Sequence, residues 1–513
     1  MHITRRAFLG AAAAAAGSTF LPGRARADEQ VARRYNLSIS MDALGDDPEL
    51  LEIVREAGIN EIWTASFFSG KWHHSIEETE QWHKRIRAAG MAVRSITIPL
   101  GHPTFNEKNP DYMPDVGLQP WQFGIDAGGR KHGGVCLHPP GTKLNVEAMA
   151  ELKKLDPGIV FVDDDFRLAI GPGNIGGCFC DKHKEAFLNR HGYGKTEWGE
   201  LLEAAREREL TPLLRTWLTD VCDELTNCFR AQQAAAAPDF RLGIMVMYLG
   251  AEKAGIRLAD YQGVPMRVGE LMFNDKSFAP VKGKTNELFS ALFHRRFVTP
   301  ELAYSETTAW PPDQLSARNM AAKLVISTIC DVRNTMFMSG LTPFPRTHWA
   351  TLGPAMKKQA GFHRQLAGHA PRGPFKHYWG EQSRWVGDDN PYSLFLAAGV
   401  PFEVTDKPAQ DGWTFLTDFD ARDFKSPGTK VVTRSDVAED LDALFELKRQ
   451  ILPKLADVPH VVEDAPVVCA WYPTANRLLL WNLAEEPQHV TLRYEKADKP
   501  VELPALDAEL VTL

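Results

Sequence analysis

Residues 158–183 read GIVFVDDDFRLAIGPGNIGGCFCDKH, and this stretch decides how the rest of the chain is interpreted. Its first part, residues 159–162, is a short apolar run of the kind that forms a buried strand. Three consecutive carboxylates follow at Asp163, Asp164 and Asp165, and a Cys-x-Cys-x2-His group comes after a glycine-rich turn. Because α/β enzymes hold their chemistry where parallel strands end, the stretch predicts a strand that leads directly into a site.

The composition is that of a large globular protein. The chain has 513 residues, of which 44% are hydrophobic and 24% charged, so it is long enough for more than one folded domain. The formal net charge of -8 gives no reason to expect nucleic acid or an anionic membrane as a partner. A neutral ligand is more consistent with this charge.

The first 27 residues are typical of an export signal. Residues 4–10, TRRAFLG, form a twin-arginine signature ahead of an alanine-rich run, and residues 25–27, ARA, offer a cleavage site. The alternative is a short membrane anchor, but the apolar run over residues 7–22 is shorter than the roughly 20 residues that a spanning helix needs. We therefore expect cleavage before Asp28 and a periplasmic or secreted mature protein, free of the membrane after cleavage.

Residues 28–372 alternate strand-like and helix-like segments, which is typical of parallel βα units. The segments that fit strands cover residues 35–42, 61–68, 91–99, 155–165, 241–248, 266–273, 301–306 and 335–340. Eight such strands predict a (β/α)8 barrel, with an open doubly wound sheet as the alternative. A Gly- and Pro-rich loop over residues 100–143 is predicted to line a site, because compact domains seldom keep long loops without a use for them.

The pattern changes after residue 370. Residues 373–458 combine short strands with a helix, which predicts a small α/β domain. Residues 459–513 contain the runs VVCAWY, RLLLWNL and HVTLRY separated by turn residues, which predict a compact antiparallel β domain.

Acids at the carboxyl ends of barrel strands face the substrate mouth. The acids that meet this criterion are Asp42, Asp164 or Asp165, Asp275 and Glu306. Three adjacent carboxylates repel one another, so we expect one or two of the aspartates after the fourth strand to face the site and the rest to pair with a cation such as Arg167. A metal ion held by the three aspartates is an alternative.

Glu306 is the strongest candidate for a catalytic residue among these acids. It closes the strand-like run AYSE and shares its loop with Trp310. A glycosidase needs two carboxyl groups on opposite sides of the scissile bond, and the fourth and seventh strands could provide them. The alternative is a Glu306 that caps a helix or belongs to a structural ion pair. Further candidates for contacts to sugar faces and hydroxyl groups are Trp310, Trp349, Arg130 and Asn274.

Seven cysteines in an exported chain would ordinarily suggest disulfides. Here Cys178, Cys180 and His183 supply three ligands within six residues, a spacing that suits tetrahedral zinc. Cys136, in the run GGVCLHP, is the best candidate for a fourth ligand, and a site closed by four protein ligands would be structural. The alternatives are reduced buried cysteines or a disulfide between two of them.

Together, the run GGRKHGGVCLHPP over residues 128–140, the acid-ended fourth strand and the cysteine group resemble the β-galactosidases of glycoside hydrolase family 42 and their relatives. The resemblance implies a barrel, a flavodoxin-like middle domain associated with trimer formation, and a small C-terminal β domain. It implies that Glu306 is the nucleophile and Asp165 the general acid/base. It also implies zinc bound by Cys136, Cys178, Cys180 and His183, with His183 in place of the family's last cysteine.

Two departures from the family leave questions open. Asp165 stands where the family has glutamate and is one methylene shorter, which leaves retention of configuration undecided. The middle domain is much shorter than the family's, so trimer formation does not follow, and a homo-oligomer of another kind is left open. The sequence thus predicts an exported glycoside hydrolase that acts on a carbohydrate by a two-carboxylate, retaining mechanism. The alternatives are a carbohydrate-binding protein on a decayed barrel and a metal-dependent sugar lyase or isomerase.

Overall fold

The computed structural model of the protein describes most of the chain from Arg33 to Leu513. The residues outside the description are 1–32, 69, 99–122, 139–140, 164–165, 169–173, 247–248, 269–273 and 455–456. The predicted export signal and both candidate acid/base residues, Asp164 and Asp165, therefore lie outside the described residues.

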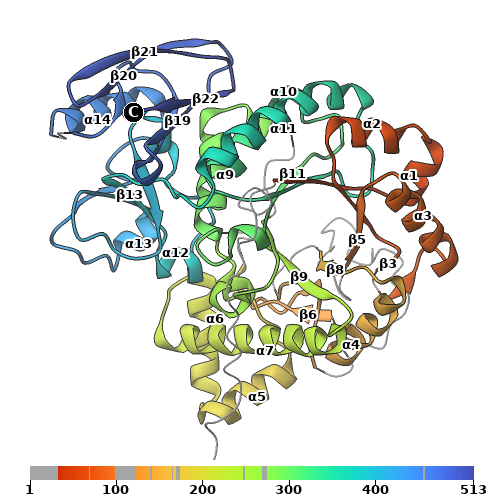
Figure 1. The fold of residues 1–513 in the computed structure, drawn as a ribbon. Coiled ribbons are helices and arrows are strands. Elements are labelled where there is room, and N and C mark those ends of the chain that lie inside the picture. Colours follow the sequence, from red (N-terminus) through yellow and green to blue (C-terminus); the bar gives the residue numbers. More distant parts are fainter. Residues whose placement is uncertain are drawn as a thin grey trace, which may run out of the picture.

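Eight parallel strands close into a barrel (Figure 1). In chain order they are β1 (Arg34–Ser38), β2 (Glu61–Thr64), β5 (Ala92–Thr97), β8 (Ile159–Val162), β9 (Arg241–Val246), β10 (Met266–Val268), β11 (Ala303–Thr308) and β12 (Asn334–Met338). Each strand pairs with its successor in this order, and β12 pairs with β1. The prediction of a (β/α)8 barrel is confirmed, because an open sheet would leave two edge strands unpaired.

Helices surround the barrel. They are α1 (Met41–Asp46), α2 (Leu50–Ala57), α3 (Ile76–Ala88), α4 (Gly141–Leu152), α5 (Asp181–His191), α6 (Lys195–Glu207), α7 (Pro212–Ala236), α8 (Asp275–Phe278), α9 (Val281–His294), α10 (Ala317–Ile329) and α11 (Arg346–Leu366). Local capping signals set several starts: the Ser75 hydroxyl accepts a hydrogen bond from the Glu78 amide at 3.1 Å at the start of α3. The described residues between β9 and β10 form the 3₁₀ turns η2 (Glu252–Ala254) and η3 (Leu258–Tyr261) where a regular barrel has an α-helix.

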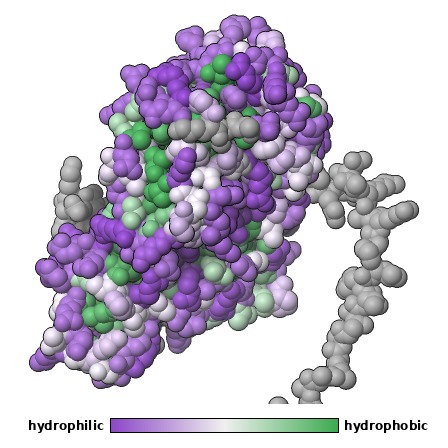
Figure 2. All heavy atoms as spheres, turned by 90° about the vertical axis from the view of Figure 1, so that its left-hand side faces the viewer, coloured by the Kyte–Doolittle hydropathy of each residue, from purple (hydrophilic) through white to green (hydrophobic). Residues whose placement is uncertain are grey.

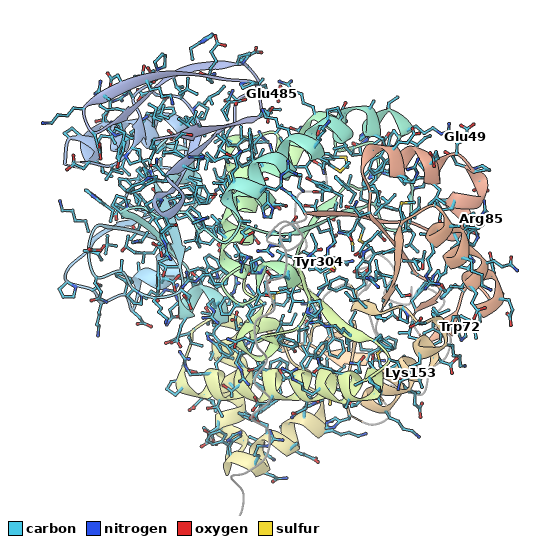
Figure 3. The ribbon with its side chains drawn as sticks, viewed as in Figure 1. Glu49, Trp72, Arg85, Lys153, Tyr304 and Glu485 are labelled. Atoms are coloured by element: carbon cyan, nitrogen blue, oxygen red, sulfur yellow. The ribbon has the colours of Figure 1, made fainter. Side chains whose placement is uncertain are left out.

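Side chains fill the barrel interior in layers. One buried cluster consists of Trp63, Ile96, Phe161, Tyr304 and Met336, and Figure 3 labels Tyr304 in the middle of the barrel. The ring centroids of Phe161 and Tyr304 are 5.0 Å apart. Side chains alternate along a strand, so Glu306, which comes two positions after Tyr304, also points inward. It lies one layer nearer the carboxyl ends of the strands.

Two further units follow the barrel. The first has a parallel sheet in the order β14-β13-β15-β16, which is the flavodoxin-like order without its fifth strand. Its elements are β13 (Phe375–Tyr378), α12 (Glu381–Val386), β14 (Phe402–Thr405), β15 (Trp413–Leu416), α13 (Asp418–Ala421), β16 (Lys430–Thr433) and α14 (Leu441–Ile451). The second unit has two antiparallel sheets, β17-β20-β21 and β18-β19-β22. Their strands are β17 (His460–Val461), β18 (Val467–Tyr472), β19 (Arg477–Asn482), β20 (Gln488–Tyr494), β21 (Ala497–Leu503) and β22 (Ala508–Thr512).

The face of the molecule on the side of these two units is mainly hydrophilic. Figure 2 shows this face, on which hydrophobic residues form only limited groups among polar ones. Among the described residues, no helix has both the length and the apolar character required to cross a membrane.

Candidate functional site

Glu306 lies inside the barrel near the carboxyl end of β11 and is only 2% exposed. The Nε atom of Arg267, on β10, is 2.7 Å from the Oε2 atom of Glu306, an ionic contact that is not aligned as a hydrogen bond. The hydroxyl of Thr308 donates a hydrogen bond to the other carboxylate oxygen. Both oxygens of Glu306 therefore have a partner within the barrel.

Arg267 joins two carboxylates from different strands. Its side chain is fully buried and also pairs with Asp163, which directly follows β8. Its guanidinium carbon lies 5.4 Å from the ring centroid of Phe161, in the layer below. Burial lowers the pKa of Arg267, and the neighbouring Glu306 opposes this effect. We call Asp163, Arg267 and Glu306 the charged layer; it covers the apolar layer on the side of the strands' carboxyl ends.

The charged layer shows the partner of one of the three aspartates. Arg167 was named as an example of a cation that could pair with the aspartates after the fourth strand; the partner of Asp163 is Arg267, two strands away in the barrel, and Asp164 and Asp165 lie outside the described residues. Sequence reasoning missed Arg267 because the run Met266–Val268 reads as an ordinary apolar strand. A sequence signal could have identified Arg267: it is an arginine at an inward-facing position of one strand, and the next strand contains the inward-facing Glu306.

A second site lies outside the barrel strands. Cys136, Cys178, Cys180 and His183 each offer one ligand atom, and these atoms all lie within 4.8 Å of one another. The Sγ atoms of Cys136 and Cys180 are 3.9 Å apart, and the Nδ1 atom of His183 is 3.3 Å from Cys180 and 3.6 Å from Cys136. The sequence prediction that these four residues come together is therefore confirmed. We call them the cysteine cluster.

The geometry of the cysteine cluster suits a metal ion. All seven cysteines are free and buried, which contradicts the alternative of a disulfide. Zinc bonds to sulfur of about 2.3 Å in a tetrahedron separate two sulfur atoms by about 3.8 Å, close to the distance between Cys136 and Cys180. Without a cation, a hydrogen bond with Cys136 together with burial raises the pKa of Cys178 to about 12. The residues present could therefore hold a metal ion whose charge would stabilise the thiolates.

Neighbouring segments bring the ligands together. Part of the long loop expected over residues 100–143 is a hairpin of β6 (Phe123–Ile125) and β7 (Lys131–Val135), which leads into Cys136. The amide of Phe179 donates to the carbonyl of Ile125 at 2.8 Å and so joins the hairpin to the other cysteines. Gly177 has a φ of +104°, which favours glycine. This conformation allows the chain to turn into Cys178.

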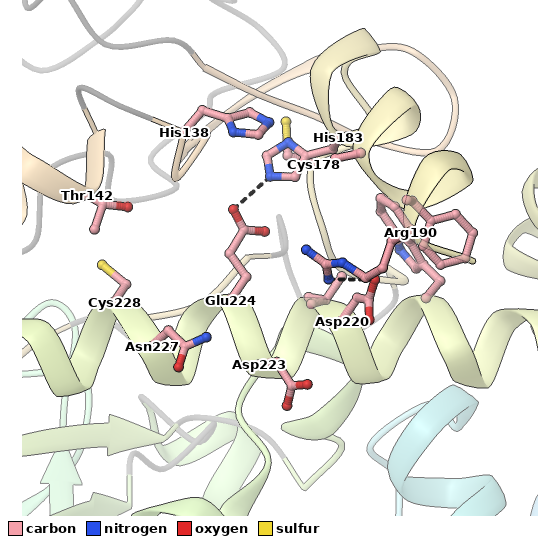
Figure 4. Close-up of a pocket in the computed structure, with 14 residues that line it drawn as sticks. His138, Thr142, Cys178, His183, Arg190, Asp220, Asp223, Glu224, Asn227 and Cys228 are labelled. Carbon is pink, nitrogen blue, oxygen red and sulfur yellow. Dashed lines mark hydrogen bonds and ion pairs between the residues drawn. The ribbon is translucent and has the colours of Figure 1, made fainter. Parts of the chain in front are cut away.

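A cavity of about 380 Å³ opens beside the cysteine cluster, between α5 and α7 (Figure 4). His183 and Cys178 line it on one side, and Glu224 from α7 reaches toward the cluster from the other. The Nε2 atom of His183 is 2.7 Å from Oε1 of Glu224. Sequence reasoning did not identify Glu224, which is one acid among several on a long amphipathic helix.

Comparison with known proteins identifies structures with a similar fold. No protein-family model matches the sequence, and no curated protein sequence matches it. The fold is similar to that of a GH42 β-galactosidase. Gan42B, a GH42 β-galactosidase from G. stearothermophilus, superposes with a TM-score of 0.60 and 11% identity over 94% of this chain and 98% of that chain. Its catalytic mutant superposes with a TM-score of 0.59 and 10% identity over the same shares. At these identities the likeness concerns the fold.

The other polar candidates have partners of their own. Asp42 is exposed on α1, with its carboxylate 3.7 Å from the Nε2 atom of His74. Arg130 lies in the turn of the β6–β7 hairpin and pairs with Asp126 at 2.9 Å. Neither residue reaches the charged layer through these contacts.

Asn274 and Asp275 serve the local structure after β10. The side chain of Asn274 caps α8 by accepting a hydrogen bond from the Ser277 amide at 3.0 Å. Asp275 accepts hydrogen bonds from the amide of Ser316 at 2.9 Å and from the side chain of Asn319 at 2.8 Å. Asp275 thus ties the start of α8 to the start of α10.

The two tryptophan candidates have opposite environments. Trp310 is 59% exposed in the segment that follows β11, the strand that carries Glu306. Trp349 is buried on α11, with its ring edge-on to Phe337 and Phe344. Trp310 is therefore free to stack on a ligand, whereas Trp349 is packed in the protein core.

Proposed function

We propose that the protein is an exported glycoside hydrolase that cleaves a glycosidic bond by double displacement. One observation carries the proposal: Glu306 points into the barrel from its seventh strand, in a fold that superposes on a GH42 β-galactosidase over 94% of the chain. Clefts at the carboxyl ends of barrel strands are where enzymes of this architecture act. The proposed substrate is an oligosaccharide or glycoconjugate.

In this mechanism Glu306 is the nucleophile. Its carboxylate attacks the anomeric carbon, while Asp165 or Asp164 protonates the leaving oxygen and later deprotonates the attacking water. Arg267 and Thr308 fix the orientation of the Glu306 carboxylate. The carboxylate form of Glu306 is the form that attacks.

Three further parts of the proposal concern the mature protein. The twin-arginine signature in residues 4–10 and the cleavage site at residues 25–27 support export to the periplasm or the medium. The cysteine cluster is proposed to hold a structural zinc ion, because four protein ligands leave no open position for substrate. When bound, the ion would fix the hairpin of β6 and β7 to the loop that precedes α5. We also propose that the mature protein forms a homo-oligomer.

Replacement of Glu306 tests the assignment. We expect Glu306→Gln to abolish turnover of aryl glycosides that the wild type cleaves, while the matched variant Glu301→Gln, in the 3₁₀ turn η4 (Pro300–Leu302) just before the same strand, keeps it. Glu306→Gly with added azide provides a second measurement, because azide in the vacated space forms a glycosyl azide of inverted configuration. Full activity of Glu306→Gln in a protein with an unchanged melting temperature would contradict the proposal.

The enclosure of Glu306 favours a second candidate function, a carbohydrate-binding protein without turnover. A carboxylate that is 2% exposed and paired on both oxygens resembles a structural ion pair as much as a nucleophile. Calorimetric titration of the wild type with the same glycosides separates the two functions. Binding without product over long incubation identifies the second, and product formation identifies the first.

A further inference from the structure

His183 presents its two ring nitrogens to different partners. Its Nδ1 atom faces the sulfur atoms of Cys180 and Cys136, and its Nε2 atom faces the carboxylate of Glu224 at 2.7 Å (Figure 4). A neutral imidazole carries one proton, so a proton on Nε2 that is donated to Glu224 leaves the Nδ1 lone pair directed toward the sulfurs. Glu224 thus selects the form of His183 that can bind a metal through Nδ1.

Glu224 differs in this respect from the other acids that line the cavity. Asp220 pairs with Arg190 at 2.9 Å and with His191 at 3.0 Å, and Asp223 pairs with Arg257 at 2.7 Å. The carboxylates of these two residues are therefore each paired with an arginine. Glu224, on the same helix, pairs with a member of the cysteine cluster instead.

The charge of the cluster gives Glu224 a second role. A divalent ion with four thiolates has a net charge of about -2, and the same ion with three thiolates and one neutral imidazole has about -1. The carboxylate of Glu224, hydrogen-bonded to that imidazole, restores the missing negative charge. The side chain of Glu224 is 28% exposed and borders the cavity, so water reaches the carboxylate and reduces the cost of keeping it charged.

We propose that Glu224 is a positioning residue of the cysteine cluster: it fixes His183 in the Nδ1-binding form and supplies the negative charge that a fourth cysteine would provide. The inference rests on the proposed metal ion and is independent of glycosidase activity. It implies that the effect of Glu224 on metal affinity depends on the presence of His183.

Metal binding by the intact chain tests this inference. Cobalt(II) is the probe, because its absorption reports both the affinity and the number of thiolate ligands, and competition with a chelator gives the dissociation constant. We expect Glu224→Gln to weaken cobalt and zinc binding by about 10- to 100-fold, the range for loss of such a carboxylate. The matched control is Asp223→Asn, which changes an acid of the same cavity and helix and should leave the affinity unchanged.

A double-mutant cycle separates this role from a general effect on folding. In the His183→Cys background, four thiolates already carry the full charge, so adding Glu224→Gln should change the affinity by less than about 3-fold. The inference is overturned if Glu224→Gln binds cobalt like the wild type, or if it weakens binding equally in both backgrounds. A wild type that binds neither zinc nor cobalt overturns it together with the zinc proposal. Hydrolysis of aryl glycosides by the same samples would still stand as a separate result.

Discussion

Replacing Arg267 by methionine tests whether the charged layer stabilises the barrel. Methionine keeps an unbranched apolar stem of similar length, so the change removes the guanidinium with little loss of packing. It leaves Asp163 and Glu306 buried without the cation that both contact. Removing one partner of a buried ion pair costs about 3–5 kcal/mol. Because Arg267 serves two carboxylates, we expect a loss in the upper part of that range.

Arg346 provides the matched control for this measurement. It also pairs with two carboxylates, those of Asp47 and Glu49, but its side chain is half-exposed at the surface. Water and salt screen such a pair, so Arg346→Met should lower stability only slightly. The assay is urea unfolding followed by tryptophan fluorescence, to which Trp63 inside the barrel contributes. The midpoint is compared because a chain with several domains need not unfold in one step.

A second substitution in the same background separates charge from packing. If the unpaired carboxylates cause the loss, adding Glu306→Gln or Asp163→Asn to Arg267→Met should raise the urea midpoint again. The reasoning is refuted if Arg267→Met lowers the midpoint no more than Arg346→Met does. It is equally refuted if neutralising the carboxylates leaves the double variants as unstable as Arg267→Met.

Two further predictions follow from exposure and burial. Trp310→Ala should raise KM for glycosides at least several-fold without changing the melting temperature, because the ring is 59% exposed; an unchanged KM would remove Trp310 from the substrate contacts. Burial lowers the pKa of His377 to about 4, so the unfolded chain takes up this proton near pH 6.5 and the folded protein only near pH 4. Stability should therefore fall by up to about 3 kcal/mol as the pH decreases from 6.5 to 4. His377→Gln should make the urea midpoint less dependent on pH between pH 6.5 and pH 4. A midpoint that depends on pH as strongly as that of the wild type would contradict this prediction.

The sequence predicted the parts of the structure that depend on local patterns. Parallel barrel strands are buried on both faces, so they appear as short apolar runs, and all eight were found near their observed positions. The helix start at Ser75 depends on a local pattern of the same kind, because its cap joins residues three positions apart. The cysteine cluster was also predictable, because Cys178, Cys180 and His183 are close in sequence and only Cys136 comes from elsewhere.

Contacts between distant strands could not be predicted in the same way. Arg267 lies 104 positions after Asp163, and nothing in either segment specifies the other as its partner. The sequence also does not show which way a side chain points. Trp349 is of a residue type that often stacks on sugars, but its position places it in the protein core. Glu224 illustrates the same limit, because only the packing of α7 against α5 shows which acid of the helix turns to His183.

The segment after β8 is attached to the rest of the molecule on both sides of Asp164 and Asp165. Before them, Asp163 is paired with Arg267 of the barrel. After them, the amide of Leu168 donates to the carbonyl of Ala254 in η2 at 2.8 Å, and its carbonyl accepts from the amide of Gly177 at 2.6 Å.

These contacts extend to the unit with the parallel sheet. The neighbouring Lys253 is buried, and its ammonium lies 2.7 Å from the carboxylate of Asp389 in that unit. Desolvation lowers the pKa of Lys253, and Asp389 opposes this shift, as expected for a pair that persists because each charge compensates the other. The barrel thus contacts the segment between β8 and α5 directly, and η2 joins this segment to the parallel-sheet unit. These attachments give a structural reason for the barrel, the cysteine cluster and the parallel-sheet unit to belong to one chain.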